Sequence, residues 1–248
     1  MRKAIYPRRT KRTFIHTAPI LVCPRMSSLT LYRANGVSSF IPHVLLKELM
    51  IPFISVIMKS GPNGWEAVDG SLNNLSYRNI HPQGYVPALQ VEGGIVTELP
   101  AIITYIASSA TNEVKLLGDS KLERAKVAEW MAWLSGTVHA QGVSMYFRPE
   151  RFTDDLSQRD QVRAKGKAAV LKGLQRIDQY LDGNKHPVGV NETVVDFILP
   201  MFWYWAVRMG IPSLKESFPH FGNLVRRMEQ KASLREVAQL EGLDLYFE

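Results

Sequence analysis

The strongest constraint on the fold is the order of strand-like and helix-like segments, because strand signals occur only in the first part of the chain. Residues 29–32 and 53–58 resemble short buried strands, and residues 40–50 between them carry apolar side chains at helical spacing. Strand, helix and strand in this order predict a βαβ unit with a right-handed crossover. The stretch 59–79 is polar and rich in glycine, so we expect a loop with one short helix there.

A hairpin and a third helix are predicted next. Residues 85–91 and 95–97 flank Glu92-Gly93-Gly94, a turn with glycine between two apolar segments. Pro100 suits the first turn of a helix, which we expect over residues 101–108. The order βαβ followed by ββα predicts a thioredoxin-like α/β domain.

The rest of the chain carries helical periodicity and no strand signal. We therefore expect an α/β domain over residues 28–111 and an all-α domain over residues 119–244, with residues 1–27 as a basic extension. Thr193 and Asp196 form a capping box at the start of one of these helices. The helical segments are residues 121–147, 156–182, 194–209 and 218–231.

The net charge of +7 comes from residues 1–27, which contain seven Lys and Arg residues and no acid. The remaining chain is neutral, with 23 basic and 23 acidic residues, so the sequence does not favour nucleic-acid binding. The basic segment resembles a mitochondrial transit peptide; the alternative, which we prefer, is translation from Met26 and a cytoplasmic protein. Cys23, the only cysteine, lies in this segment, which leaves no disulfide framework. No apolar run is long enough to span a membrane, and we expect neither a membrane partner nor a metal site.

Two serines, Ser38 and Ser39, lie at the junction of the first strand and the first helix. The free N–H groups and the positive end of the helix dipole at such a junction face the space above the strand. Either hydroxyl could cap the helix, or it could donate a hydrogen bond to a bound anion such as a thiolate. The sequence leaves both roles open and does not decide between the two serines.

Two further segments favour a peptide-like ligand. Pro87 precedes a strand and cannot donate to its ladder, so we expect a cis Val86–Pro87 bond that turns the Val86 N–H and C=O outward. Residues 97–100 place a carboxylate and free amides before a helix, where a ligand carboxylate can bind while Glu98 holds an ammonium group. Glutathione combines a zwitterionic end, a peptide-like middle and a thiol, and would satisfy all three sites.

This ordered set of motifs resembles the glutathione transferase family, and most closely its bacterial beta-class branch. The resemblance runs from about residue 29 to residue 243 and therefore covers nearly all of the chain outside the basic segment. No single motif is decisive, but their order is. The matching segments are residues 31–44, PQGYVPAL at 82–89, TELPAI at 97–102, WLSGTVH at 133–139, FRP at 147–149, the capping box and residues 226–242.

The resemblance implies a role for each site residue. Val86, next to Pro87, would pair with the cysteinyl backbone of glutathione, and Ser38 would face the sulfur. Glu98 and the Leu99 amide would hold the γ-glutamyl end. The resemblance also implies a homodimer, in which the helix after Pro100 packs on the partner's helical domain.

His139 would act near the thiol or the glycyl end of glutathione; the alternative is a histidine that only packs against the first domain. Three departures from the family pattern matter, and the first is Ala132, which stands where an asparagine often helps the active site. Ser38 stands where the beta class has a cysteine, which removes mixed-disulfide chemistry, because a hydroxyl cannot exchange with a disulfide. Leu99 stands where a serine or glycine is usual, so it offers its amide but no side-chain hydrogen bond.

The second substrate is expected to be an apolar electrophilic small molecule. We expect Phe40, Met145 and Phe147 to line its pocket. The sequence therefore predicts a glutathione transferase that activates the thiol of glutathione as a thiolate. One alternative is a glutathione-dependent cis–trans isomerase acting on a conjugated double bond. The other is a non-catalytic protein that keeps the fold for binding or regulation.

Overall fold

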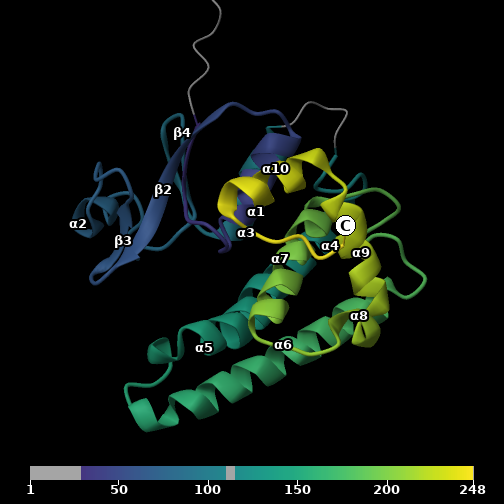
Figure 1. Ribbon diagram of the computed structural model, residues 1–248. Helices are drawn as coiled ribbons and strands as arrows, with labels where there is room; N and C mark the ends of the chain where they lie inside the picture. Colours follow the sequence, from purple (N-terminus) through teal and green to yellow (C-terminus); the bar gives the residue numbers. More distant parts are fainter. Residues whose placement is uncertain (1–28, 110–114, 248) are drawn as a thin grey trace, which may run out of the picture.

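The computed structural model describes residues 29–109 and 115–247, so the expectations for residues 1–27 lie outside the described part. The first part of the described chain, from Leu29 to Ser108, forms a five-stranded mixed sheet with three helices (Figure 1). Its elements are β1 (Leu29–Arg33), α1 (Phe40–Glu48), β2 (Phe53–Gly61), β3 (Gly64–Ala67), α2 (Asn74–Tyr77), β4 (Ala88–Val91), β5 (Gly94–Val96) and α3 (Leu99–Ser108).

The strands lie in the order β3-β2-β1-β4-β5. β1 and β2 are parallel, with Leu31 opposite Ser55, and β4 is antiparallel to β1, with Leu89 opposite Leu31. The βαβ–ββα order confirms the thioredoxin-like domain. The loop expected over residues 59–79 is wrong in part, because β2 continues to Gly61 and β3 returns beside it as an antiparallel strand. Asn63-Gly64, a common hairpin dipeptide, was the signal for this turn.

The alternation of side chains along β1 gives each face of the sheet its own core. Leu31 and Leu89 face α1 and α3, and this core continues into the helical lobe. Tyr32 and Ala88 face the other side, where Tyr77 of α2 is fully buried against them. The face that carries α1 and α3 is thus the one on which the second lobe packs (Figure 1).

The second lobe is helical throughout the described residues, as expected. Residues 121–147 form one continuous helical rod, but its middle section, which carries His139, is wound as a π-helix. α10 was not expected from the sequence. The elements are α4 (Lys121–Trp133), the π-helix η1 (Leu134–Val143), α5 (Ser144–Phe147), the short turns η2 (Pro149–Arg151) and η3 (Leu156–Gln158), α6 (Arg159–Leu181), α7 (Val194–Arg208), α8 (Leu214–Ser217), α9 (Pro219–Glu229) and α10 (Ala232–Glu241).

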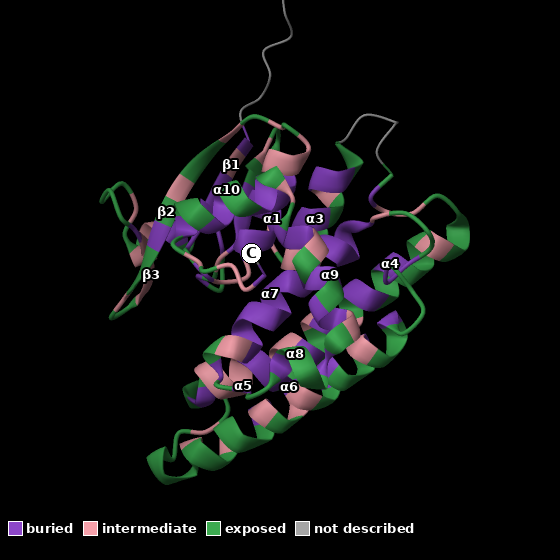
Figure 2. Ribbon diagram, turned by 45° about the vertical axis from the view of Figure 1, so that its right-hand side comes forward, coloured by how far each residue is buried: buried purple, intermediate pink, exposed green. Residues whose placement is uncertain are grey.

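α7 lies at the centre of this lobe and is buried over most of its length (Figure 2). Its N-terminus has the expected capping box, because the Thr193 side chain accepts from the Val195 N–H and Asp196 accepts from the Thr193 N–H. A helix that is apolar on all sides must be buried on all sides. α7 therefore connects the helical lobe to α1 of the sheet lobe. Among the described residues, no helix combines the length and the apolar character needed to cross a bilayer.

Candidate functional site

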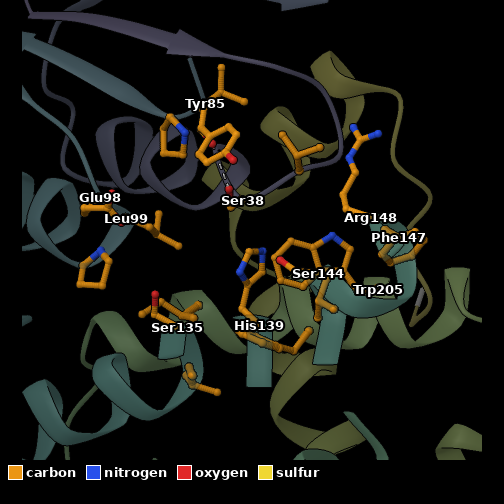
Figure 3. A pocket seen from close by; sticks show the side chains of 18 of the residues that line it. Ser38, Tyr85, Glu98, Leu99, Ser135, His139, Ser144, Phe147, Arg148 and Trp205 are labelled. Atoms are coloured by element: carbon orange, nitrogen blue, oxygen red, sulfur yellow. Dashed lines mark hydrogen bonds between the residues drawn. The ribbon is translucent and has the colours of Figure 1, made fainter. Parts of the chain in front are cut away.

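A cavity of about 500 Å³ opens between the two lobes (Figure 3). One wall comes from the turn before α1, from the segment around Val86 and from the start of α3. The opposite wall comes from η1, α5, η2 and α7. Six of the residues singled out from the sequence for glutathione line this cavity: Ser38, Val86, Pro87, Glu98, Leu99 and His139.

Ser38 lies immediately before α1, on the cavity wall. Its Oγ donates to the Val86 carbonyl at 3.5 Å, which is a long and weak hydrogen bond that a better acceptor can replace. Among the described residues, the backbone N–H groups of Ser38 and Ser39 have no hydrogen-bond acceptor. A hydroxyl and two free amides at a helix N-terminus make this part of the cavity suited to an anion.

Ser39 does not face the cavity, which corrects its inclusion among the candidate catalytic residues. It is fully buried, and its Oγ donates to the Ala34 carbonyl at 2.9 Å and accepts from the Ala34 N–H at 3.0 Å. The Ser39 hydroxyl therefore uses both its donor and its acceptor capacity to close the turn between β1 and α1. The two serines point in different directions because they lie about 100° apart around the helix start.

The turn that carries Ser38 is held from the helical lobe at Gly36. Glu241 of α10 accepts from the Gly36 N–H at 2.9 Å, and Arg208 of α7 donates to the Gly36 carbonyl at 2.9 Å. Glu241 is buried and also contacts His43 Nδ1 at 2.8 Å. Gly36 has φ +66°, a conformation that favours glycine. Side chains distant in sequence thus fix the position of the Ser38 hydroxyl.

The Val86–Pro87 peptide bond is cis, as expected from the sequence. The Tyr77 hydroxyl donates to the Tyr85 carbonyl at 2.7 Å and anchors this segment on the sheet lobe. Glu98 is exposed and has φ +66°, an uncommon conformation for a residue with a side chain. Such strain occurs at functional sites more often than elsewhere, because the surrounding structure must hold it.

His139 lies on η1 and faces the cavity, with its ring 5.2 Å from that of Trp205. Burial, and to a lesser extent the nearby Arg151 guanidinium, lower the pKa of His139 to about 4. The imidazole is therefore neutral at pH 7. A neutral imidazole can donate or accept one hydrogen bond at the sulfur, but it carries no charge to stabilise a thiolate.

The apolar part of the cavity differs from the expectation. Phe147 lines it, together with Ile198, Phe202 and Trp205 of α7. Phe40 does not: it is fully buried between α1 and α7, edge-on to Tyr204 with the ring centroids 5.9 Å apart. Met145 does not line the cavity either, because its Cβ lies beside Gly166 of α6.

The sequence reasoning missed several cavity residues, and four of them have basic side chains: His81, Arg148, Arg151 and Arg208. Arg148 belongs to the Phe-Arg-Pro motif already noted, so its position could have been found, whereas Arg208 ends a helix and reads as an ordinary helix terminus. His81 is buried, and its Nδ1 has no hydrogen-bond partner among the described residues. Burial lowers the pKa of His81, and the Glu98 charge opposes this shift.

Comparison with known proteins gives matches for both lobes. The family model "Glutathione S-transferase, N-terminal domain" matches residues 39–109, and "Glutathione S-transferase, C-terminal domain" matches residues 136–232. The chain is 25% identical over 218 residues to glutathione S-transferase GstA of Escherichia coli O157:H7, which covers 87% of this chain and 100% of that protein. A glutathione S-transferase of Xanthomonas campestris, GST-4.5, matches with the same identity and the same coverage.

Solved structures are similar over the same length. The beta-class glutathione S-transferase of Sphingomonas chungbukensis superposes with a TM-score of 0.75 at 26% identity, covering 87% of this chain and 100% of that one. A sphingomonad glutathione S-transferase in complex with glutathione gives a TM-score of 0.72 at 25% identity, with the same coverage. Both lobes therefore have counterparts in these relatives.

Proposed function

Because this chain belongs to the glutathione S-transferase family and is a glutathione transferase, we propose that its interlobe cavity activates the thiol of glutathione as a thiolate for attack on an apolar electrophile. The observation that carries this proposal is the Ser38 hydroxyl, which faces the cavity at the N-terminus of α1. The proposal assigns glutathione binding to residues 28–111 and most of the electrophile site to residues 119–244.

Glutathione fits the sheet-lobe wall in an extended conformation. Its cysteinyl backbone would pair with Val86, and its γ-glutamyl carboxylate would bind the Leu99 amide at the N-terminus of α3. Glu98, exposed at the same helix end, would hold the ammonium group. The relative solved in complex with glutathione supports a ligand of this kind.

The thiol would then lie beside Ser38, where the free amides and the hydroxyl favour the anion. A thiol with a pKa of about 8.5 is only a few per cent ionised at neutral pH. A hydrogen bond to a charged group contributes roughly 1.5–3 kcal/mol, and one pKa unit corresponds to about 1.36 kcal/mol. One donor could thus lower the thiol pKa by about 1–2 units, which leaves a large share of bound glutathione as thiolate.

The transfer step needs no group beyond glutathione and the electrophile. With a chloroarene, the thiolate forms a carbon–sulfur bond, the carbon–chlorine bond breaks, and chloride leaves with its electron pair. The thiol proton has already passed to solvent. Phe147 and Trp205 would hold the electrophile above the sulfur, and the neutral His139 would orient the sulfur by a hydrogen bond.

The experiment is turnover of chlorodinitrobenzene with glutathione by the wild type and by Ser38→Ala. We expect kcat/KM to fall about tenfold to a hundredfold at pH 6.5, with a smaller loss at pH 9, where the thiol ionises without help. Difference absorbance of the bound thiolate against pH should give a pKa raised by about 1–2 units. An unchanged thiolate pKa in Ser38→Ala would contradict this role.

Ser38→Cys tests the position of the side chain without depending on turnover. This variant and its control are made with Cys23→Ser, which removes the native thiol. A thiol at residue 38 next to the glutathione sulfur should exchange with oxidised glutathione, which forms a mixed disulfide and releases one reduced glutathione, so that mass spectrometry shows one glutathione added. Ser39→Cys is the matched control, because that side chain points into the core and should stay unmodified in the folded protein.

The isomerase alternative uses the same thiolate. The sulfur adds to a conjugated double bond, the adduct rotates about the resulting single bond, and the thiolate leaves again. Consumption of one isomer of a cis enone with no loss of glutathione would identify this reaction. Glutathione binding without turnover of any electrophile would favour the non-catalytic alternative.

A further inference from the structure

The cavity carries a second chemical feature that thiolate activation does not use: an arginine pair beside its apolar wall. We infer that the electrophile carries a carboxylate, which Arg148 and Arg208 hold while its apolar part packs on Phe147 and Trp205. This inference rests on the proposed function and names the class of its second substrate, an aromatic or conjugated carboxylate.

The two arginines come from different elements, and both adjoin Phe147, Arg148 as its neighbour in the chain and Arg208 in space. Arg148 follows Phe147 at the end of α5, and the Arg208 guanidinium carbon lies 5.4 Å from the centre of the Phe147 ring. Both residues are exposed at their helix ends and line the cavity, whereas Trp205 is buried in the same wall. An apolar surface next to two guanidinium groups suits a ligand that is apolar in one part and anionic in another.

Among the described residues that line the cavity, no acidic side chain accompanies the two arginines; Glu241, which accepts from the Gly36 N–H, is not a lining residue. Neither arginine forms an ion pair among the residues that the structure describes. Glu98 is the only acidic residue that lines the described cavity, and it belongs to the opposite wall. His139 is neutral, so it adds no competing charge. Two guanidinium groups in a partly enclosed site therefore favour an anionic ligand.

The glycyl carboxylate of glutathione is another anion that an arginine of this cavity could bind. Arg151 is better placed for that carboxylate than Arg148 or Arg208. Arg151 lies over the Tyr85 ring at 4.3 Å, next to the Val86 segment on which glutathione would lie. In Figure 3, Glu98 and Leu99 lie on one side of Ser38, and Phe147, Arg148 and Trp205 lie on the other. The arginine pair thus lies on the electrophile side of the sulfur.

Arg208 also has a structural role, because it donates a hydrogen bond to the Gly36 carbonyl in the turn that carries Ser38. A carboxylate bound between Arg208 and Arg148 would therefore lie within reach of the same turn. The carboxylate itself does not react: sulfur bonds to the activated ring carbon, the carbon–chlorine bond breaks, and chloride departs with the electron pair.

The test compares turnover of chloronitrobenzoate and chloronitrobenzamide, two substrates that differ in charge but little in shape. Each catalysed rate is divided by the rate of the same substrate with glutathione in the absence of enzyme. We expect the wild type to prefer the benzoate by about tenfold in kcat/KM, as for a charged hydrogen bond in a partly solvated site. Arg148→Gln should remove this preference while leaving the KM for glutathione unchanged. The preference should also weaken as salt is raised.

Arg176→Gln is the matched control, since Arg176 lies on α6, stacks on Trp133 and does not line the cavity. Equal turnover of benzoate and amide by the wild type would overturn the inference and leave the transferase function standing. A rise in the KM for glutathione in Arg148→Gln, with the benzoate preference retained, would also overturn it and assign Arg148 to the glycyl carboxylate.

A binding measurement keeps the inference testable if no chloroarene is turned over. Calorimetry with the two preformed glutathione conjugates, one bearing the carboxylate and one the amide, compares their affinities for the wild type and Arg148→Gln. Tighter binding of the carboxylate conjugate by the wild type alone would support the arginine pair even if the transferase proposal failed. Equal affinities would reject it.

Discussion

Ser38 and Ser39 are adjacent in the sequence and have different surroundings in the fold. Ser39 provides both hydrogen bonds that close the turn at Ala34, and it is fully buried. Ser38 makes only one long contact and faces the cavity. The hydroxyl with few internal partners is therefore the one available to a ligand, and the other is structural.

Ser39→Ala should destabilise the fold and not act on the thiol directly. It leaves the buried Ala34 N–H and carbonyl without partners, so we expect the free energy of unfolding to fall by about 1–3 kcal/mol. Urea unfolding followed by circular dichroism would measure this loss. Ser38→Ala is the control and should lose much less stability; equal losses in both variants would contradict the assignment.

His139 should make the stability of the protein depend on pH on the acid side of neutrality. Its folded-state pKa of about 4 lies below the ordinary value, so between these two values the unfolded chain binds more protons than the folded one. The free energy of unfolding should therefore rise from pH 4 to about 6.5, by at most about 1.4 kcal/mol per pH unit from this group, and level off above that range.

His139→Gln removes this titration, and unfolding curves at several pH values would show a shallower acid slope. All other titratable groups are the same in the wild type and His139→Gln, so the difference between the two slopes isolates His139. Identical slopes in wild type and His139→Gln would show that the imidazole is not held neutral by burial.

At the scale of elements, the rod that carries His139 and Phe147 is positioned by close contact with α6. A Cβ at Gly166 would lie 2.7 Å from the Gly142 carbonyl oxygen and 2.8 Å from the Tyr146 nitrogen, both backbone atoms that cannot rotate away. Glycine lets the two helical backbones approach, and the cavity wall depends on this approach.

Gly166→Ala should force the rod away from α6, which we expect to cost about 1–3 kcal/mol of stability and to lower kcat/KM by displacing the electrophile wall. Gly136→Ala, on η1, is the matched control: nothing lies within 4 Å of its added Cβ, so alanine should be neutral or stabilise by about 0.5–1 kcal/mol. Thermal unfolding of both variants checks this, and a Gly166→Ala protein as stable as the wild type would refute it.

At the scale of the whole molecule, we expect a homodimer, as the family resemblance implies and as two-fold pairing makes common. Small residues, Ala125, Ala128 and Ala132, are exposed on α4 at helical spacing, and Thr104 is exposed on α3. Ala128→Arg should shift the protein from dimer to monomer in sedimentation velocity, with Lys172→Ala on exposed α6 as the control. A monomeric wild type would contradict this expectation.

Much of the fold follows from local sequence signals. The apolar alternation of β1, the helical spacing of α1 and the capping box of α7 are each encoded within a few neighbouring residues. Local signals of this kind predicted most of the elements in their order, and Pro87 before a strand predicted the cis Val86–Pro87 bond. The residues proposed to bind glutathione line one cavity for the same reason, because they lie at the ends of predictable strands and helices. β3 was missed because its hairpin lies within a polar segment.

The tertiary structure alone decided which side chains face the cavity. Phe40 and Met145 looked suitable from their position in the chain, but α7 and α6 cover them. Arg208 and Glu241 hold the Ser38 turn although about 200 residues separate Glu241 from it. Local propensities fix the elements, whereas the direction of each side chain depends on packing between distant elements, which no short stretch of sequence contains.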